Sequence, residues 1–215
     1  MDNHQQLIVR ESNRYDDILQ FGFDDHYRNS TLKAIAMIGW HRNRCPTARL
    51  LMKLDDDVFV NIDLLVRVLP DISRSPGIHG HAHLAALVPR YRYETNYVSP
   101  EVWPSDSDAV PVTVAGAAYI MDNQSRDTLL AGLAKHQDIP VAGVPEDNFL
   151  IGFLANRTGV WRHHSQWFRA DRCWCPTRLH TIPVHFECPN QRKVWHTFTT
   201  TSGNSSGGVG SIFYY

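Results

Sequence analysis

A short apolar segment that runs directly into three aspartates is the feature that most constrains this chain. Residues 49–54 (RLLMKL) are mostly apolar, as in a buried strand, and Asp55, Asp56 and Asp57 follow at once. In open α/β sheets, ligands collect at the carboxyl ends of the strands. The sequence therefore predicts an α/β fold with a binding site at this end of the sheet.

The aspartate triplet predicts a divalent cation. Adjacent carboxylates repel one another, so a bound cation is the natural compensation, and oxygen ligands suit Mg²⁺ or Mn²⁺. In an extended segment Asp55 and Asp57 would share a face while Asp56 points elsewhere. A solvated acidic loop is the alternative, and the preceding apolar strand favours the metal. A calcium EF-hand loop is disfavoured because Val60 stands where that loop needs glycine.

A second acidic pair, Glu146-Asp147, follows Pro145 at the start of a predicted helix. The apolar face of that helix would comprise Phe149, Leu150, Phe153 and Leu154. Helix starts stabilise anions, which is expected to keep Asp147 ionised as a general base must be. In displacement at a sugar carbon, one carboxylate deprotonates the incoming hydroxyl while a metal stabilises the departing diphosphate. The alternative is ordinary helix-start chemistry.

Apolar periodicity and capping residues predict the remaining elements. They are strands at 18–23, 58–60 and 112–121, and helices at 30–42, from Asn61 to near Pro70, and from Asp122 or Asn123 to about His136. Residues 77–111 are expected to form strands and long loops around a site. We expect one domain over residues 1–198 and a low-complexity tail over 199–215.

Composition excludes several classes of protein. With 21 basic and 22 acidic residues, the chain lacks the charge excess of nucleic-acid-binding proteins. It contains no apolar stretch near the roughly 20 residues that span a bilayer, so we expect no membrane anchor in it. The cysteines are Cys45, Cys173, Cys175 and Cys188. Cys173, Cys175 and Cys188 with His180 and His185 could form a zinc site, but their spacing is not that of a standard site, which favours disulfides or buried thiols.

Several motifs, in order, resemble one known family. They are YDDIL at 15–19, DHYRNSTLK at 25–33, Trp40 with Cys45-Pro46, KLDDDVFVN at 53–61, YVSPE at 97–101, AGAAYI at 115–120, and Glu146-Asp147 with Gly152. The chain is similar to the β-1,3-galactosyltransferase/β-1,3-N-acetylglucosaminyltransferase family, glycosyltransferase family 31. Its members are Golgi enzymes with the GT-A fold.

The resemblance implies a mixed, mostly parallel central sheet flanked by helices, truncated at its N-terminus. The family's first strand-helix unit and membrane anchor have no counterpart in the chain. It implies an inverting hexosyltransferase that moves galactose or N-acetylglucosamine from a UDP-sugar to a glycan on protein or lipid, forming a β-1,3 linkage. Manganese, or magnesium, would be the cofactor. Full-length relatives would be type II membrane proteins facing the Golgi lumen.

The resemblance also implies roles for individual residues. Asp57 would be the principal metal ligand with Asp55 beside it, and His185 would complete the metal shell, with His180 and His196 as rivals. Asp147 would be the base, with Glu146 beside it at the catalytic centre. The donor-binding residues would be Lys53, Asp55, Asp56, Asp57, Gly116 and Tyr119. Asn96, Val114, Ala118 and Asn148 replace the family's usual residues, so sugar specificity is not carried over.

Two other functions compete with this interpretation. Asp55-x-Asp57 also fits the nucleophile motif of haloacid dehalogenase-type phosphatases, with Glu146-Asp147 as the later acidic pair. Trapping of phosphate analogues on Asp55 would identify such an enzyme. The other alternative is a non-catalytic homologue that binds sugar or a partner glycosyltransferase. Such a protein should show no metal-dependent affinity for UDP.

Overall fold

A mixed four-stranded sheet organises the protein. The computed structural model describes residues 3–84, 86–94, 96–103, 109–136, 141, 143–169 and 182–185. In spatial order the strands are β1 (Leu50–Leu54), β6 (Thr113–Asp122), β3 (Ile78–His83) and β7 (Arg162–His164). β6 is antiparallel to both β1 and β3, whereas β3 and β7 are parallel. The predicted α/β class is confirmed.

The prediction of a mostly parallel sheet is wrong for the described strands. β1, β3 and β7 run in one direction, but the long strand β6 lies between β1 and β3 and runs the other way. Two of the three neighbouring pairs are therefore antiparallel. The apolar run at 112–121 indicates a strand buried on both faces, and such a pattern carries no information about strand direction.

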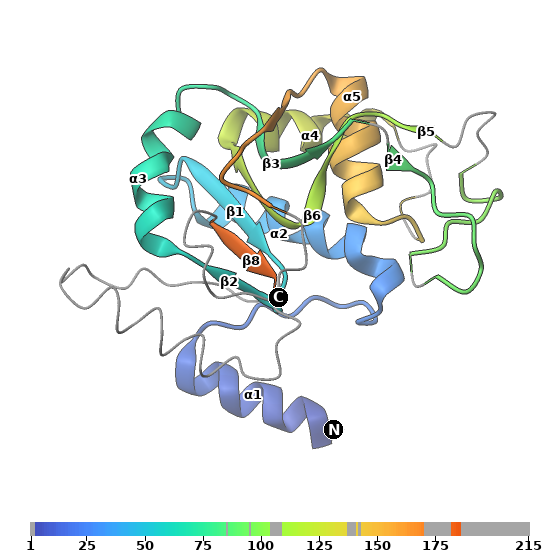
Figure 1. Ribbon diagram of the computed structural model, residues 1–215. Helices are drawn as coiled ribbons and strands as arrows, with labels where there is room; N and C mark the ends of the chain where they lie inside the picture. The colour runs from blue at the N-terminus through green and yellow to red at the C-terminus, as the bar shows by residue number, and fades with distance from the viewer. Residues whose placement is uncertain are drawn as a thin grey trace.

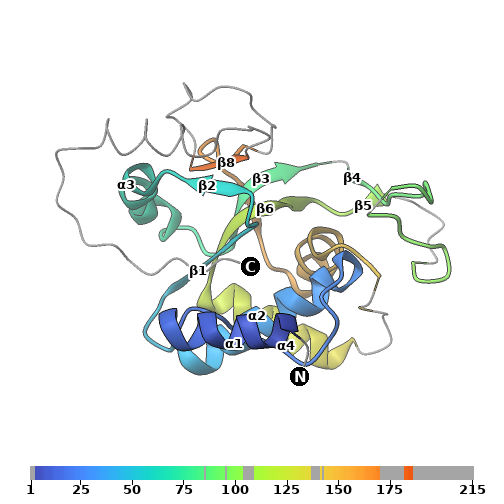
Figure 2. The same ribbon diagram turned by 90° about the horizontal axis from the view of Figure 1, so that it is seen from below.

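Helices cover both faces of the sheet (Figures 1 and 2). One face carries α2 (Ser30–Arg44), α4 (Asn123–Lys135) and a π helix (Asp147–Leu154) that continues as α5 (Ala155–Thr158). The other carries α3 (Ile62–Ile72) and the small antiparallel pair of β2 (Val58–Val60) and β8 (Pro183–His185). Side chains of β6 alternate between two cores: Tyr119 and Met121 face the first layer, and Ala118 and Ile120 the second.

The predicted caps are confirmed. The side chain of Asn61 accepts a hydrogen bond from the Leu64 N–H at 3.1 Å, and that of Asp122 accepts one from Ser125 at 2.6 Å. The predicted helices at 30–42 and 122–136 and the strands at 49–54 and 58–60 are observed within a few residues. α3 continues through Pro70 to Ile72, two residues beyond the predicted stop near Pro70.

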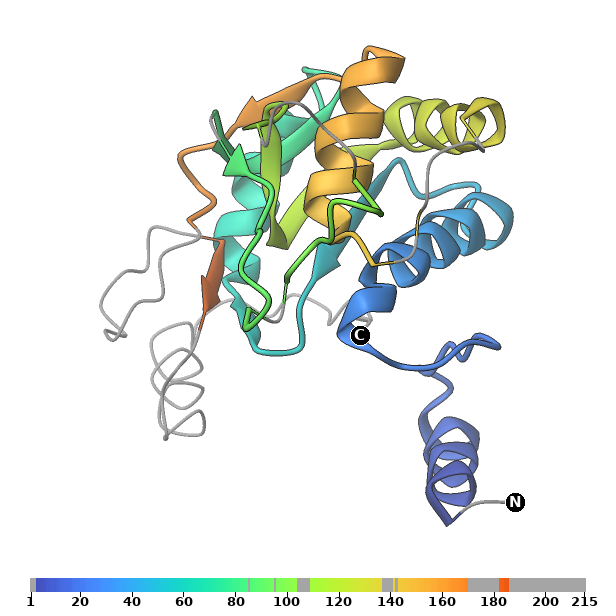
Figure 3. The ribbon, with the colours of Figure 1, turned by 90° about the vertical axis from the view of Figure 1, so that its right-hand side faces the viewer.

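The N-terminal region differs most from prediction. Residues 18–23 form no strand, although their alternation predicted one, because they pair with no other strand in the described part of the chain. The helix α1 (Asn3–Tyr15) was not predicted; it buries no residue and stands apart from the sheet (Figure 3). Between β3 and β6, β4 (Ala86–Leu87) pairs with β5 (Ala109–Val110).

Several predictions fall on residues outside the described ranges. They concern the zinc alternative with Cys173, Cys175, Cys188 and His180, the rival ligand His196, and the tail at 199–215. Cys45 is described, and it is a half-buried free thiol. Among the helices that the structure describes, none combines the length and apolar character needed to cross a membrane.

Candidate active site

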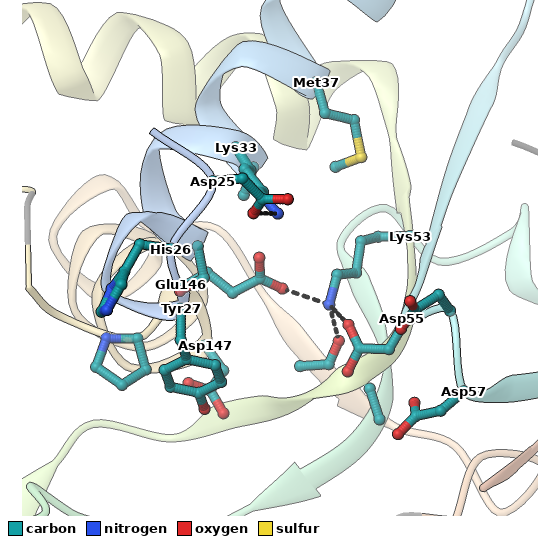
Figure 4. Close-up of a pocket in the computed structure, with 16 residues that line it drawn as sticks. Asp25, His26, Tyr27, Lys33, Met37, Lys53, Asp55, Asp57, Glu146 and Asp147 are labelled. Carbon is teal, nitrogen blue, oxygen red and sulfur yellow. Dashed lines mark hydrogen bonds and ion pairs between the residues drawn. The ribbon is translucent and has the colours of Figure 1, made fainter. Parts of the chain in front are cut away.

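A cavity of about 600 Å³ opens where β1 ends, facing the start of α2 (Figure 4). It is lined by Asp25, His26, Tyr27, Ser30, Lys33, Ala34, Met37, Lys53, Asp55, Asp56, Asp57, Gly116, Ala117, Pro145, Glu146 and Asp147. The two acidic groups predicted from sequence, which lie far apart along the chain, therefore meet in one cavity.

The aspartate triplet occupies a turn between β1 and β2. Asp55 N–H donates to the carbonyl of Ala117 at 3.0 Å, and Val58 N–H donates back to the carbonyl of Asp55 at 3.2 Å. The triplet is therefore not extended, as was assumed when Asp55 and Asp57 were expected to share a face while Asp56 pointed elsewhere. Because the backbone turns here, all three residues line the cavity, with Asp55 directed toward Lys53 and Asp57 farther along the turn (Figure 4).

Lys53 connects the two acidic groups. Its ammonium contacts the Asp55 carboxylate and donates to the carbonyl of Gly116, and it lies 2.9 Å from Oε1 of Glu146 (Figure 4). Only 11% of the Lys53 side chain is exposed. One cation thus links the end of β1, the middle of β6 and the start of the π helix. Lys53 was predicted to bind the donor; in the structure its ammonium holds the site together.

Burial has opposite effects on Glu146 and Lys53. Glu146 is only 7% exposed, and burial raises its pKa to about 7 although Lys53 acts to lower it. Burial by itself would lower the pKa of Lys53, but the carboxylates of Glu146 and Asp55 outweigh burial and raise it. Lys53 therefore stays cationic. The Glu146 carboxyl populates both its protonated and its ionised form near neutral pH.

Asp147 is held at the first position of the π helix. Its Oδ1 accepts a hydrogen bond from Asn148 N–H at 2.9 Å, and its carbonyl accepts one from the Thr113 hydroxyl. Burial raises the pKa of Asp147, and the hydrogen bond from Asn148 N–H opposes this effect. The prediction that Asp147 is ionised as a base stays a prediction. A carboxylate with a raised pKa is a stronger base once ionised.

The helix that carries Asp147 was predicted, but not its π winding. Phe149, Leu150 and Leu154 are fully buried as expected, and Phe153 packs against the same core. The π form is rare and is often found at functional sites. Gly152 fits this crowded segment closely, because a Cβ there would lie 2.9 Å from Val110 Cγ1 and 3.2 Å from the carbonyl oxygen of Asp147.

Comparison with known proteins agrees with the geometry. The family described as Galactosyltransferase matches residues 2–166, a range that includes both acidic groups. The chain belongs to the galactosyltransferase family. Membership rules out the haloacid dehalogenase-type phosphatase, and the resemblance found in the motifs is confirmed.

Individual relatives cover most of the chain. A lactosylceramide 1,3-N-acetyl-beta-D-glucosaminyltransferase B from Xenopus laevis is 32% identical over 169 residues, covering 78% of this chain and 43% of the relative. A human acetylgalactosaminyl-O-glycosyl-glycoprotein beta-1,3-N-acetylglucosaminyltransferase is 30% identical, covering 72% and 39%. Mouse beta-1,3-galactosyltransferase 4 is 29% identical, covering 79% and 54%. The chain thus spans about half the length of these curated relatives.

Of the remaining predicted residues, Gly116 lies at the site and Tyr119 does not. Gly116 lines the cavity, and a Cβ at this position would lie 3.6 Å from both Glu146 Oε1 and Asp147 Cβ. Tyr119 is fully buried in the core and does not line the cavity, so the structure gives it a packing role. The β2–β8 register pairs His185 with Val58, so the His185 backbone lies beside the residue that follows Asp57.

This galactosyltransferase-family site includes residues for which no role was predicted from the sequence. Tyr27 begins the 3₁₀ helix η1 (Tyr27–Asn29), which His26 caps by accepting the Arg28 N–H at 3.0 Å. Burial raises the pKa of Tyr27 most. The negative charges of Asp147, Asp55 and Glu146 raise it further. Lys33 pairs with Asp25 at 2.5 Å on the same wall. The signal available in the sequence was the dense polar segment directly before α2.

The carboxylates fit a divalent cation that is shared with a substrate. Within the described ranges no three His, Cys, Asp or Glu side chains form a complete metal cluster. Mg²⁺ and Mn²⁺ sites in phosphate-transferring enzymes use one or two protein carboxylates and take other ligands from substrate phosphates and water. Asp55 and Asp57, which line the cavity on one turn, match that donor set.

Proposed function

We propose that this chain is the catalytic part of an inverting, metal-dependent β-1,3-hexosyltransferase with a GT-A-type fold. It would move galactose or N-acetylglucosamine from a UDP-sugar to a glycan hydroxyl on a protein or lipid acceptor. The observation that carries the proposal is that the Asp55–Asp57 turn and Asp147 line one cavity and are linked by Lys53 and Glu146. The mixed sheet with helices on both faces supports the GT-A assignment.

The reaction requires a base, and we assign this role to Asp147. Its carboxylate removes the proton of the acceptor hydroxyl, the hydroxyl oxygen forms a bond to the anomeric carbon, and the bond from that carbon to the diphosphate oxygen breaks with inversion. Burial, which raises the pKa of Asp147, strengthens the base. A bound Mn²⁺ or Mg²⁺ would stabilise the negative charge of the departing diphosphate.

The remaining site residues hold the reacting groups in place. Asp57 and Asp55 would ligate the metal, and His185, whose backbone lies beside the turn, would complete its shell. Asp56 and Gly116 would contact the donor from the cavity wall. Lys53 fixes Asp55 relative to Glu146, and therefore relative to Asp147. Pre-positioning of this kind lowers the barrier to displacement.

The names of the relatives guide the choice of substrates and compartment. Those named above are described as N-acetylglucosaminyl- or galactosyltransferases, so both UDP-sugars are donors to test. Lactosyl glycosides are the first acceptors to test, because a relative is named for lactosylceramide. The Golgi lumen is the proposed compartment, where longer relatives would be held by a membrane anchor.

Calorimetric titration with UDP, with and without Mn²⁺, tests the proposal. Asp57→Ala should abolish metal-dependent UDP binding, whereas Asp147→Asn should preserve binding and remove transfer. Asp71→Asn is the matched control, since Asp71 is an exposed carboxylate paired with Arg74 on the distant helix α3. Loss of UDP binding in both site variants would contradict the assigned roles. A wild-type chain that binds no UDP in the presence of Mn²⁺ would instead be the non-catalytic homologue.

A further inference from the structure

Two tyrosines form an exposed stacked pair that the proposed mechanism does not use. Tyr91 and Tyr93 are 63% and 83% exposed, and their ring centroids lie 5.6 Å apart with planes inclined by 23°. They lie in the segment after β4, residues 88–94 and 96–103, which we term the tyrosine loop. A turn closed by Glu94 N–H and the carbonyl of Tyr91, 3.0 Å apart, presents both rings. Neither ring belongs to either core cluster.

The tyrosine loop is firmly anchored beneath these rings. Val98 N–H donates to the Pro89 carbonyl at 2.9 Å, and the Arg90 guanidinium donates to the carbonyls of Val98 and Trp103 at 3.0 and 2.9 Å. Val88 and Val98 are buried in the core. The backbone is thus held by hydrogen bonds and apolar packing while two large rings stay in water. Aromatic surface that is fixed in solvent is typical of a binding site.

The tyrosine loop borders the side of the cavity where Asp147 lies. Its Trp103 packs edge to face on Phe153 of the π helix, with ring centroids 5.1 Å apart. A small cleft is lined jointly by Asn96 and Tyr97 of the loop and by Tyr27, Arg28, Gly143 and Pro145. Tyr27 and Pro145 also line the main cavity. In Figures 1 and 3 the green loop descends beside the gold helix.

This position is where an acceptor must approach. The aspartate turn lies at the end of β1, so the donor diphosphate belongs on that side, and the acceptor hydroxyl must reach Asp147 from the other. A sugar ring has an apolar C–H face and a polar hydroxyl rim. Tyrosine matches both, since its ring is apolar and its hydroxyl forms hydrogen bonds at little cost in conformational entropy.

We propose that Tyr91 and Tyr93 form a subsite for a second sugar ring of the acceptor, one residue beyond the sugar whose hydroxyl reacts. This inference rests on the proposed transferase function. It predicts that the enzyme distinguishes disaccharide from monosaccharide acceptors through the tyrosine pair. The acceptor class is therefore an oligosaccharide of at least two rings.

Acceptor kinetics test the subsite, with methyl β-lactoside and methyl β-galactoside as probes. In the double variant Tyr91→Ala/Tyr93→Ala, KM for the lactoside should rise about 5- to 10-fold, as expected for the loss of aromatic contacts. The kcat for the lactoside and KM for the galactoside should stay unchanged. Tyr91→Phe/Tyr93→Phe should retain most of the lactoside affinity, because the rings remain. Tyr15→Ala removes an exposed tyrosine on α1 and is the matched control.

Binding without turnover separates this inference from the proposed function. Saturation-transfer NMR on the full chain with methyl β-lactoside should show transfer to the lactoside C–H groups, weakened at least threefold in the alanine double variant and unchanged in Tyr15→Ala. That result would support the subsite even if no UDP-sugar were transferred. A double variant with wild-type lactoside KM and NMR transfer would overturn the subsite, as would equal losses for lactoside and galactoside.

Discussion

Two regions of the sheet bury ionisable side chains in contrasting ways. At the end of β1, Lys53 is packed against Asp55 and Glu146, so opposite charges compensate one another. Between β3 and β7, the rings of His79 and His163 stack with centroids 4.5 Å apart. His79 Nε2 lies 2.6 Å from the carbonyl oxygen of Ser75, and His163 Nε2 lies 3.0 Å from that of Pro76.

The comparison shows what each arrangement is suited to do. A buried ion pair is costly and sensitive to the loss of either partner, but it holds charged groups where a charged substrate can be bound. The histidine stack contains no carboxylate, and its rings pack across the junction of two strands. Burial raises the pKa of Glu146 and lowers that of His79, so the two regions should respond to pH in opposite directions.

The largest expected effect comes from removing the shared cation. Lys53→Met would leave Asp55 and Glu146 facing each other without compensation, and the free energy of unfolding should fall by about 3–5 kcal/mol. Urea denaturation measures this. Lys33→Met is the control, because the Lys33–Asp25 pair is far more exposed and should contribute less than about 1 kcal/mol. Equal losses in the two variants would show that Lys53 is no more important than a surface lysine.

A glycine next to the histidine stack gives the next largest effect. Gly77 has a φ of +147°, and a Cβ there would lie 2.6 Å from Cδ2 of His163 and 2.8 Å from the backbone oxygen of Trp161. Gly77→Ala should therefore destabilise the protein by about 1–3 kcal/mol and shift the imidazole NMR signals of His163. Gly39→Ala, in a helical position with open space around it, should be neutral or stabilising. Unchanged His163 signals in Gly77→Ala would contradict this account.

Raising the pH should weaken the acidic region. The folded chain keeps Glu146 protonated up to its raised pKa of about 7, whereas the unfolded chain releases that proton near 4.5. The stabilising contribution of this group is thus present below pH 4.5 and lost as the pH rises to about 7. Denaturation at several pH values should show this slope in the wild type and lose it in Glu146→Gln. A slope that persists in the variant must come from other groups.

Lowering the pH should weaken the histidine region, with the smallest effect. Burial lowers the pKa of His79 below its ordinary 6.5, and the charge of His163 adds to this, while the Ser75 carbonyl and Asp122 oppose it. The unfolded chain therefore takes up a proton first, and stability falls as the pH drops below about 6.5. Comparing His79→Gln with the wild type at pH 5.5 and 7.5 isolates this group from His41 and His83, whose pKa values are also lowered.

Local signals in the sequence predicted local structure well. Asn61 and Asp122 cap the helices that they were expected to cap, because a capping side chain acts within three residues. The two acidic groups were also found, since each follows or precedes an element with clear apolar periodicity. Their meeting in one cavity was predicted through family resemblance, not through spacing.

Features that depend on partners far along the chain were not predictable. The direction of β6 depends on which strands flank it, and the apolar run at 113–122 is compatible with either direction. Tyr119 was assigned to the donor through the family resemblance of residues 115–120, but its side chain is fully buried in the core. Lys53 has its role only because Gly116 and Glu146 approach it after folding.

The π helix places a constraint on how this site can change. Each residue added to or removed from an α-helix rotates all preceding side chains by about 100° relative to those that follow. Asp147 stands at the entrance of the wider winding, ahead of the buried stretch that fixes the helix against the sheet. Shortening that stretch by one residue would swing the carboxylate around the helix axis while leaving the aspartate turn untouched. The direction of the Asp147 carboxylate therefore depends on the length of an apolar segment, and substitutions at the cavity wall cannot restore it.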